Sequence, residues 1–124
     1  FPIIKELYRI CENNAIIDIE CPHPAHRWQV VDFTHQKPIH IEGLQMLDKS
    51  YCEKLIKAKS TKSPLAIMYN VDFRISDYNC TLDPQCVDHI KNVLGSFDKE
   101  KMDSYIHLFN NVAATQKIKL QAVK

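Results

Sequence analysis

The chain has 124 residues, of which 45% are apolar and 25% are charged, and its 16 basic and 15 acidic side chains leave a formal net charge of +1. This balance lacks the basic surplus of a non-specific nucleic-acid binder, and no apolar run approaches the roughly 18 residues of a membrane helix. We therefore expect one domain over residues 1–124 that neither binds nucleic acid nor inserts into a membrane, while an anchor outside this segment stays open.

The first part of the chain predicts a helix followed by short strands. A proline at the second position suits the first turn of a helix over residues 2–13, because its missing N–H has no partner there. Alternating apolar and polar side chains predict a strand over 15–20, and two prolines after it interrupt regular structure. A second strand is predicted over 27–34 and an optional third over 39–42.

The middle of the chain contains the clearest alternation. Residues 44–59 have the apolar spacing of a helix, which Asp48 or Ser50 would cap. Apolar and mixed side chains then alternate from 65 to 75. Because successive side chains of a strand point to opposite faces, we predict a long inner strand there, followed by a loop over 76–83.

The last part predicts two helices and a strand. Asp83 with the proline after it is typical of a helix start, and Gly95 is typical of a helix end. Ser96 or Asp98 opens the next helix. Residues 117–124 alternate lysine or glutamine with apolar side chains, and the lysines favour an edge strand protected from further pairing.

These elements predict an α+β fold. The expected sheet is antiparallel, has four or five strands and carries helices on one face. The expected order is α-β-β-(β)-α-β-α-α-β. The long strand would lie inside this sheet and the C-terminal strand at its edge.

Five cysteines are present. Cys80 and Cys86 flank five residues at the start of a predicted helix, and a turn of that length can bring two Cα atoms within the ~4.4–6.8 Å that a disulfide requires. We predict this bond, with two reduced thiols as the alternative. The pairing of Cys11, Cys21 and Cys52 stays open, and an odd number leaves one thiol buried or available to a partner.

Cysteine and histidine side chains gather early in the chain. Thiolate and imidazole are zinc ligands, so the alternative to surface histidines is a zinc site. This site would use Cys21, His23 and His26, with His35 or His40. The spacing matches no familiar zinc motif, and we favour no metal. With only two glycines there is no glycine-rich phosphate loop, and we expect no cofactor.

The sequence contains no nucleophile motif, which favours a protein that is not an enzyme. We predict a non-enzymatic, extracytoplasmic interaction module, an ectodomain or accessory subunit that binds another protein. The extracytoplasmic setting follows from the cysteines and from a first residue that is not Met. The candidate contact residues are Tyr78, Lys117 and Lys119. Asn79 begins a match to the N-glycosylation acceptor pattern, and a small-ligand-binding domain is a further alternative.

Overall fold

The computed structural model describes residues 2–124. Within this range the chain is α+β, as predicted, and its one open antiparallel sheet has three strands instead of four or five. Seven α-helices and one 3-10 helix make up the rest of the regular structure in the described chain. The elements in order are α1 (Pro2–Ile10), β1 (Ile16–Pro22), α2 (Trp28–Val31), α3 (Ile41–Gln45), α4 (Lys49–Lys57), α5 (Leu65–Tyr69), β2 (Phe73–Leu82), α6 (Pro84–Leu94), η1 (Lys99–Lys101), α7 (Met102–Leu108) and β3 (Ala113–Ala122).

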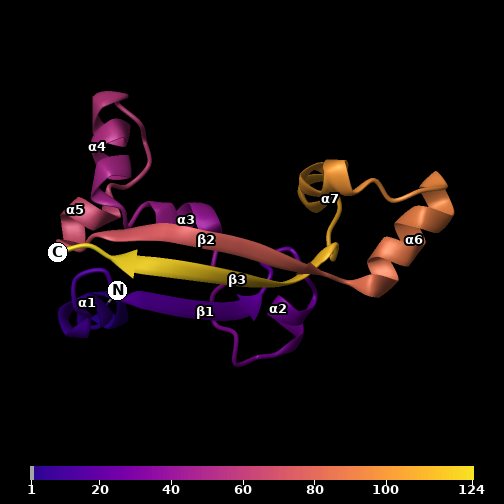
Figure 1. The fold of residues 1–124 in the computed structure, drawn as a ribbon, viewed down its shortest axis with the longest axis horizontal. Coiled ribbons are helices and arrows are strands. Elements are labelled where there is room, and N and C mark those ends of the chain that lie inside the picture. The colour runs from indigo at the N-terminus through magenta and orange to yellow at the C-terminus, as the bar shows by residue number, and fades with distance from the viewer. Residues whose placement is uncertain (1) are drawn as a thin grey trace. The chain divides into compact units, whose positions relative to one another are not determined.

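The C-terminal strand is the central strand of the sheet. The strand order is β1-β3-β2, so the edge position predicted for residues 117–124 is wrong (Figure 1). The predicted alternation itself is present, because the lysines are exposed and the apolar side chains between them are buried. Lys117 lies 3.4 Å from Glu20 of β1, and Lys119 lies 4.0 Å from Asp18. The lysines therefore face carboxylates across the sheet instead of protecting an edge.

The chain divides into two compact units, and each strand contributes residues to both. The prediction of a single domain stays a prediction. We call the part of the described chain formed by residues up to 19, 40–78 and 118–124 unit 1, and the part formed by residues 20–39 and 79–117 unit 2.

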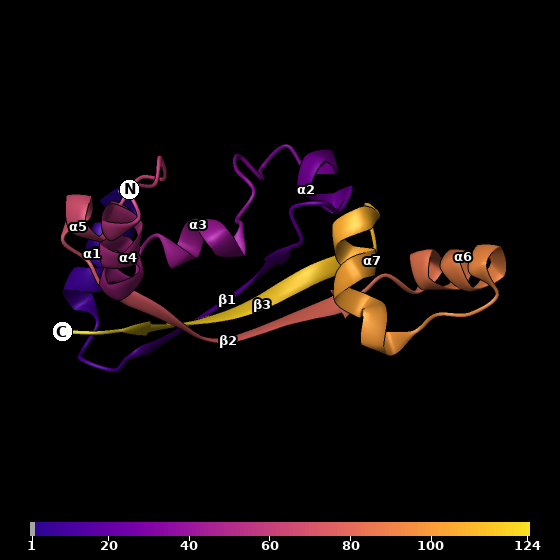
Figure 2. The ribbon, with the colours of Figure 1, turned by 90° about the horizontal axis from the view of Figure 1, so that it is seen from above.

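Unit 1 is built around apolar side chains of two strands. Phe73 of β2 and Ile118 and Leu120 of β3 are almost completely buried. The ring of Tyr8 on α1 packs edge-on against Phe73, with 5.3 Å between ring centroids. Helices α1, α3 and α4 lie on the same side of the strands in this unit (Figure 2). Burying each such side chain stabilises the fold by about 1.5–3 kcal/mol.

The long strand predicted over residues 65–75 is wrong. The chain forms α5, turns at Asn70 with a left-handed φ of 51°, and only then enters β2. Residues in the first half of the run are all apolar, and periodicity cannot separate a short apolar helix from a strand in that case. Ala66 is buried while the next two side chains are exposed, which suits a helix turn. Since β2 continues to residue 82, a strand replaces the loop predicted over 76–83.

A short helix also replaces the strand predicted over 27–34. The N–H of Gln29 donates to the carbonyl of His26 at 3.0 Å, which starts α2. The β-branched side chains of this segment favour a strand only where a neighbouring strand packs against them, and the three-stranded sheet of the described chain offers none here. The optional strand over 39–42 is likewise absent, because the chain enters α3 at Ile41.

Two carboxylates hold the start of α4. Of the two predicted caps, Asp48 and Ser50, Asp48 is the N-cap and accepts a hydrogen bond from the N–H of Tyr51 at 3.1 Å. The second carboxylate is that of Asp72, which is buried and accepts from the N–H of Lys49 at 3.0 Å. Both bonds satisfy N–H groups that have no partner inside the helix.

The predicted start and end of α6 are confirmed, and of the two predicted starts of the next helical segment, Ser96 and Asp98, the structure uses Asp98. Asp83 caps α6, and Gly95 ends that helix with a φ of 77°. Asp98 caps η1 by accepting from the N–H of Glu100 at 2.9 Å. None of the helices found in residues 2–124 combines the length and the hydropathy needed to cross a bilayer.

Candidate functional site

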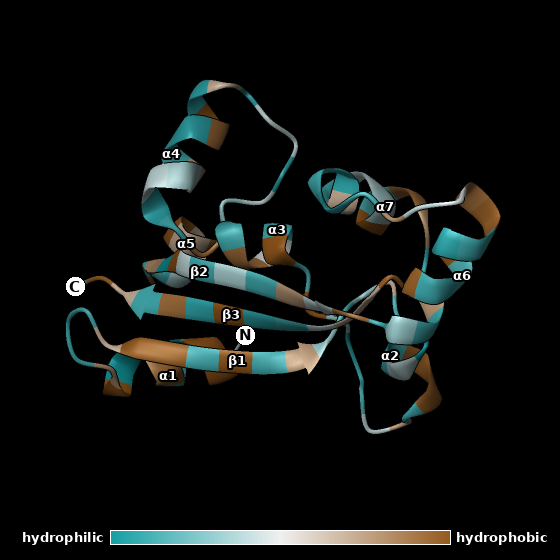
Figure 3. Cartoon of the chain, turned by 45° about the vertical axis from the view of Figure 1, so that its right-hand side comes forward, coloured by the Kyte–Doolittle hydropathy of each residue, from teal (hydrophilic) through white to brown (hydrophobic). Residues whose placement is uncertain are grey.

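Unit 2 buries polar side chains and exposes large apolar ones. The buried polar residues are His26, Gln29, Asp83 and Gln116, and the buried apolar ones are Ile90, Val112, Ala113 and Ala114. Around α2 the exposed large apolar side chains are Trp28, Val30, Val31 and Phe33. Those on α6 and at the end of α7 are Val93, Leu94, Leu108 and Phe109. Brown segments on α2 and at the C-terminal end of α6 mark parts of this surface in Figure 3. Apolar side chains that gather on a surface mark interaction sites.

A buried histidine and aspartate connect two distant segments of unit 2. His26 Nε2 lies 3.0 Å from Asp83 Oδ2, and the two side chains are 0% and 11% exposed. The backbone N–H of Trp28 donates to His26 Nδ1 at 3.2 Å. Nδ1 is therefore the acceptor and Nε2–H donates to Asp83, which fixes the tautomer of the ring.

The second oxygen of Asp83 caps α6. Oδ1 accepts from the N–H of Gln85 at 2.8 Å and from the N–H of Cys86 at 3.3 Å. The hydrogen bond from His26 lowers the pKa of Asp83, the two N–H groups act in the same direction, and burial opposes them. This carboxylate therefore serves a helix and a buried ring at once.

The geometry does not make the His26–Asp83 pair a catalytic dyad. A general base needs a nitrogen that can reach a substrate proton, and both ring nitrogens of His26 already have partners. The imidazole ring is also completely buried. The pair instead positions the residues that follow His26 along the chain.

Those residues form a small loop with an apolar exterior, which we call the apolar loop (residues 28–35). Trp28, Val30, Val31 and Phe33 are 46%, 73%, 66% and 98% exposed. The indole of Trp28 packs edge-on against His26, with 4.6 Å between ring centroids. This contact anchors the first residue of the loop on the buried pair.

Polar contacts close the apolar loop. The N–H and the hydroxyl of Thr34 donate to Asp32 Oδ1 at 2.9 Å and 2.7 Å. His35 Nδ1 lies 3.1 Å from the carbonyl oxygen of Trp28, which can only accept, so Nδ1–H donates. These bonds hold the loop from within and leave its apolar side chains outside.

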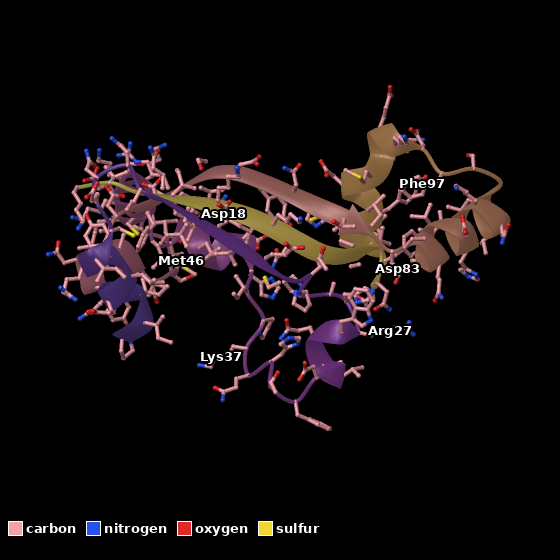
Figure 4. All side chains as sticks on the ribbon, turned by 60° about the horizontal axis from the view of Figure 1, so that its bottom comes forward. Asp18, Arg27, Lys37, Met46, Asp83 and Phe97 are labelled. Carbon is pink, nitrogen blue, oxygen red and sulfur yellow. The ribbon has the colours of Figure 1, made fainter. Side chains whose placement is uncertain are left out.

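A cleft of about 310 Å³ lies beside the start of the loop in unit 2. Figure 4 shows Arg27 and Asp83 close together at this end of the strands. The lining comes from the start of α2, the end of β2, the start of α6 and the beginning of β3. It includes Arg27, Trp28, Thr81, Leu82, Pro84 and Thr115.

The disulfide predicted between Cys80 and Cys86 is not formed, and no disulfide joins any of the five cysteines in residues 2–124. Cys80 lies inside β2 and Cys86 in the first turn of α6. The predicted bond requires a turn between the two cysteines. Instead β2 stays extended to residue 82 at ~3.3 Å per residue, which places Cys80 away from the start of the helix. Burial and then the charge of Asp83 raise the pKa of the Cys86 thiol.

The structure does not gather the side chains of the alternative zinc site. Cys21 Sγ accepts from Gln116 Nε2 at 3.4 Å, and burial raises the pKa of this thiol. His23 Nδ1 accepts from the N–H of Ala25 at 3.3 Å, and His26 is bound to Asp83. No group of three or more histidine, cysteine or acidic side chains in the described chain is arranged to hold a metal ion.

The predicted contact residues lie elsewhere. Tyr78 is exposed on β2 and lines a cleft of about 440 Å³ in unit 1, together with Tyr51 and Lys54. Lys117 and Lys119 are exposed on β3 and face the carboxylates of β1. Whether these three residues contact a partner stays a prediction.

Sequence reasoning missed the apolar loop because it assigned these side chains to a strand. The Asp-x-Thr spacing after α2 is the one local signal for the closed turn. Comparison with known protein families, with curated proteins and with solved structures finds no match.

Proposed function

We propose that the chain is a non-enzymatic interaction module that binds another protein through the apolar loop of unit 2. The observation that carries this proposal is the distribution of side chains in unit 2. Polar groups such as His26 and Asp83 are buried there, while Val30, Val31 and Phe33 are exposed. Leaving apolar surface in water costs about 25 cal/mol per Å², and a partner that covers it recovers this free energy.

The shape of the loop favours a protein over a small molecule. Small ligands bind in concave sites, whereas Phe33 is 98% exposed and can insert into a pocket of another protein. Aromatic side chains supply much of the energy at protein interfaces. The contacts that close the loop also reduce the entropy lost on binding, because the loop is ordered before the partner arrives.

The proposal is independent of cellular location. The extracytoplasmic setting stays a prediction, and the five cysteines do not support it because none of them forms a disulfide in residues 2–124. The zinc alternative gains no support either, because its side chains are bound to different neighbours.

Photo-crosslinking tests the proposal. The photoreactive amino acid p-benzoylphenylalanine replaces Phe33 in one variant and Ile56, an exposed residue on α4, in a control variant. In cells of the source organism, we expect the variant with the photoreactive residue at position 33 to give one major protein adduct, and the variant with it at position 56 not to give that adduct. The same adducts from both positions, or none from position 33, would contradict the proposal.

A further inference from the structure

We propose that the cleft of unit 2 beside the apolar loop receives an apolar side chain of the partner that is flanked by a carboxylate, with Arg27 binding the carboxylate. This inference rests on the proposed function and specifies the chemistry of the segment that is bound. The cleft and the apolar loop share Trp28, so one partner would cover both.

The walls of the cleft suit one apolar side chain. Trp28, Leu82, Pro84 and Ala114 supply apolar surface, while hydroxyls and an amide are contributed by other lining residues. A volume of about 310 Å³ is at the lower end of the range for small-ligand sites, which is enough for a side chain and its adjoining backbone. A mostly apolar cleft with a few polar groups is the usual composition of a binding site.

The charge at the cleft selects a carboxylate. Arg27 is exposed, and its guanidinium forms no ion pair with any carboxylate in residues 2–124. Asp83 also lines the cleft, but one of its oxygens is bound to His26 and the other to the start of α6. The available charge is therefore the guanidinium, whose planar N–H groups match a carboxylate in bidentate geometry.

Two of the side chains that would contact the partner, those of Arg27 and Trp28, are attached to a backbone held by hydrogen bonds. The N–H of Arg27 donates to Asn111 Oδ1 at 2.7 Å, and the N–H of Asn111 donates to the carbonyl of Ala25 at 3.0 Å. Trp28 is held through its own N–H and its ring contact with His26. Binding would consequently order few groups that are not already ordered.

Tryptophan emission reports directly on this cleft, because Trp28 is the single tryptophan of the chain and is half-exposed in the cleft wall. The probe is N-acetyl-L-leucine, which carries one apolar side chain and one carboxylate. Its neutral amide and N-acetylglycine are the controls for charge and for the side chain. We expect a saturable change in emission with a Kd in the millimolar range for the acid, as for a small fragment, and roughly fivefold weaker binding of each control.

Variants assign the effect to Arg27. Arg27→Gln keeps a polar side chain but removes the charge, and it should bind the acid no better than the amide. Lys54→Gln, in the cleft of unit 1, removes a positive charge elsewhere and should leave the titration unchanged. Equal affinities for acid and amide, a change that does not saturate, or an unaltered Arg27→Gln titration would each overturn the inference. If the titration fails but position 33 still crosslinks to a partner, the proposed function is retained and only the inference about the cleft is rejected. If position 33 gives no crosslink either, both are rejected.

Discussion

At the scale of single residues, Asp83 has two tasks that one carboxylate can perform only because it has two oxygens. Oδ2 accepts from the buried ring of His26, and Oδ1 accepts from the N–H groups of Gln85 and Cys86. The first bond fixes the origin of the apolar loop, and the second caps α6. One side chain thus holds together the two segments that border the cleft.

Asp83→Asn should destabilise the protein by about 1–3 kcal/mol at neutral pH, because the amide has one accepting oxygen and leaves one buried donor without a partner. Asp98→Asn is the matched control, since Asp98 caps η1 and Asn is an equally good cap. Urea unfolding followed by Trp28 emission measures both variants. Equal stabilities of the two variants would show that the bond between His26 and Asp83 contributes nothing.

The stability that is lost in Asp83→Asn should also depend on pH. The pKa of Asp83 is lowered in the folded state. The stability that Asp83 contributes is therefore complete above the pKa of an aspartate in the unfolded chain, about 3.9, and is lost as the pH falls through the lower pKa of the folded state. The difference in free energy of unfolding between wild type and Asp83→Asn should therefore shrink as the pH falls from about 4 to about 2. A difference that grows over this range would be inconsistent with the lowered pKa.

At the scale of elements, the structure differs most from the prediction at the junction between α5 and β2. A strand over 65–75 requires an extended backbone at Asn70, whereas the structure has a left-handed φ of 51° there. Asn tolerates this conformation better than most residues do, and β-branched residues tolerate it least. One substitution at this position can therefore distinguish the two arrangements.

Asn70→Val should destabilise the protein by about 1–2 kcal/mol, because valine strains the left-handed backbone. Asn92→Val, at an exposed helical position of α6, controls for β-branching, and Asn70→Gly should cost little. Thermal and urea unfolding of the three variants measure these differences. If Asn70→Val were as stable as Asn92→Val, an extended backbone at this residue would be the better description.

Sequence reasoning succeeded where the signal is local. The caps at Asp48 and Asp83 and the helix end at Gly95 depend on residues within one turn, and all three are confirmed. The central position of β3 depends on which strands pair, and residues 28–31 adopt a short helix because no strand pairs with this segment. The candidate site combines both kinds of information, because the cap at Asp83 could be predicted and its bond to His26 could not.

At the scale of the whole molecule, both units bury apolar as well as polar side chains, and they differ in what lies beside their exposed apolar residues. Unit 1 has an apolar core that includes Phe73, Ile118 and Leu120. Unit 2 buries a polar pair and displays apolar side chains on ordered backbone. The hydrogen bonds that close the apolar loop beside this pair are the basis for assigning partner binding to unit 2, since an ordered apolar surface gains most from being covered.

The most direct test measures, by isothermal titration calorimetry, how tightly this chain binds the partner protein that crosslinking from position 33 identifies. The variant Val31→Ser with Phe33→Ser removes apolar surface from the loop, and Ile56→Ser with Ile67→Ser removes exposed apolar surface from unit 1. Unchanged thermal unfolding of both double variants would show that the fold is intact. We expect the loop variant to bind at least about tenfold more weakly and the unit 1 variant to bind like wild type. Equal affinity of the loop variant and wild type would contradict it.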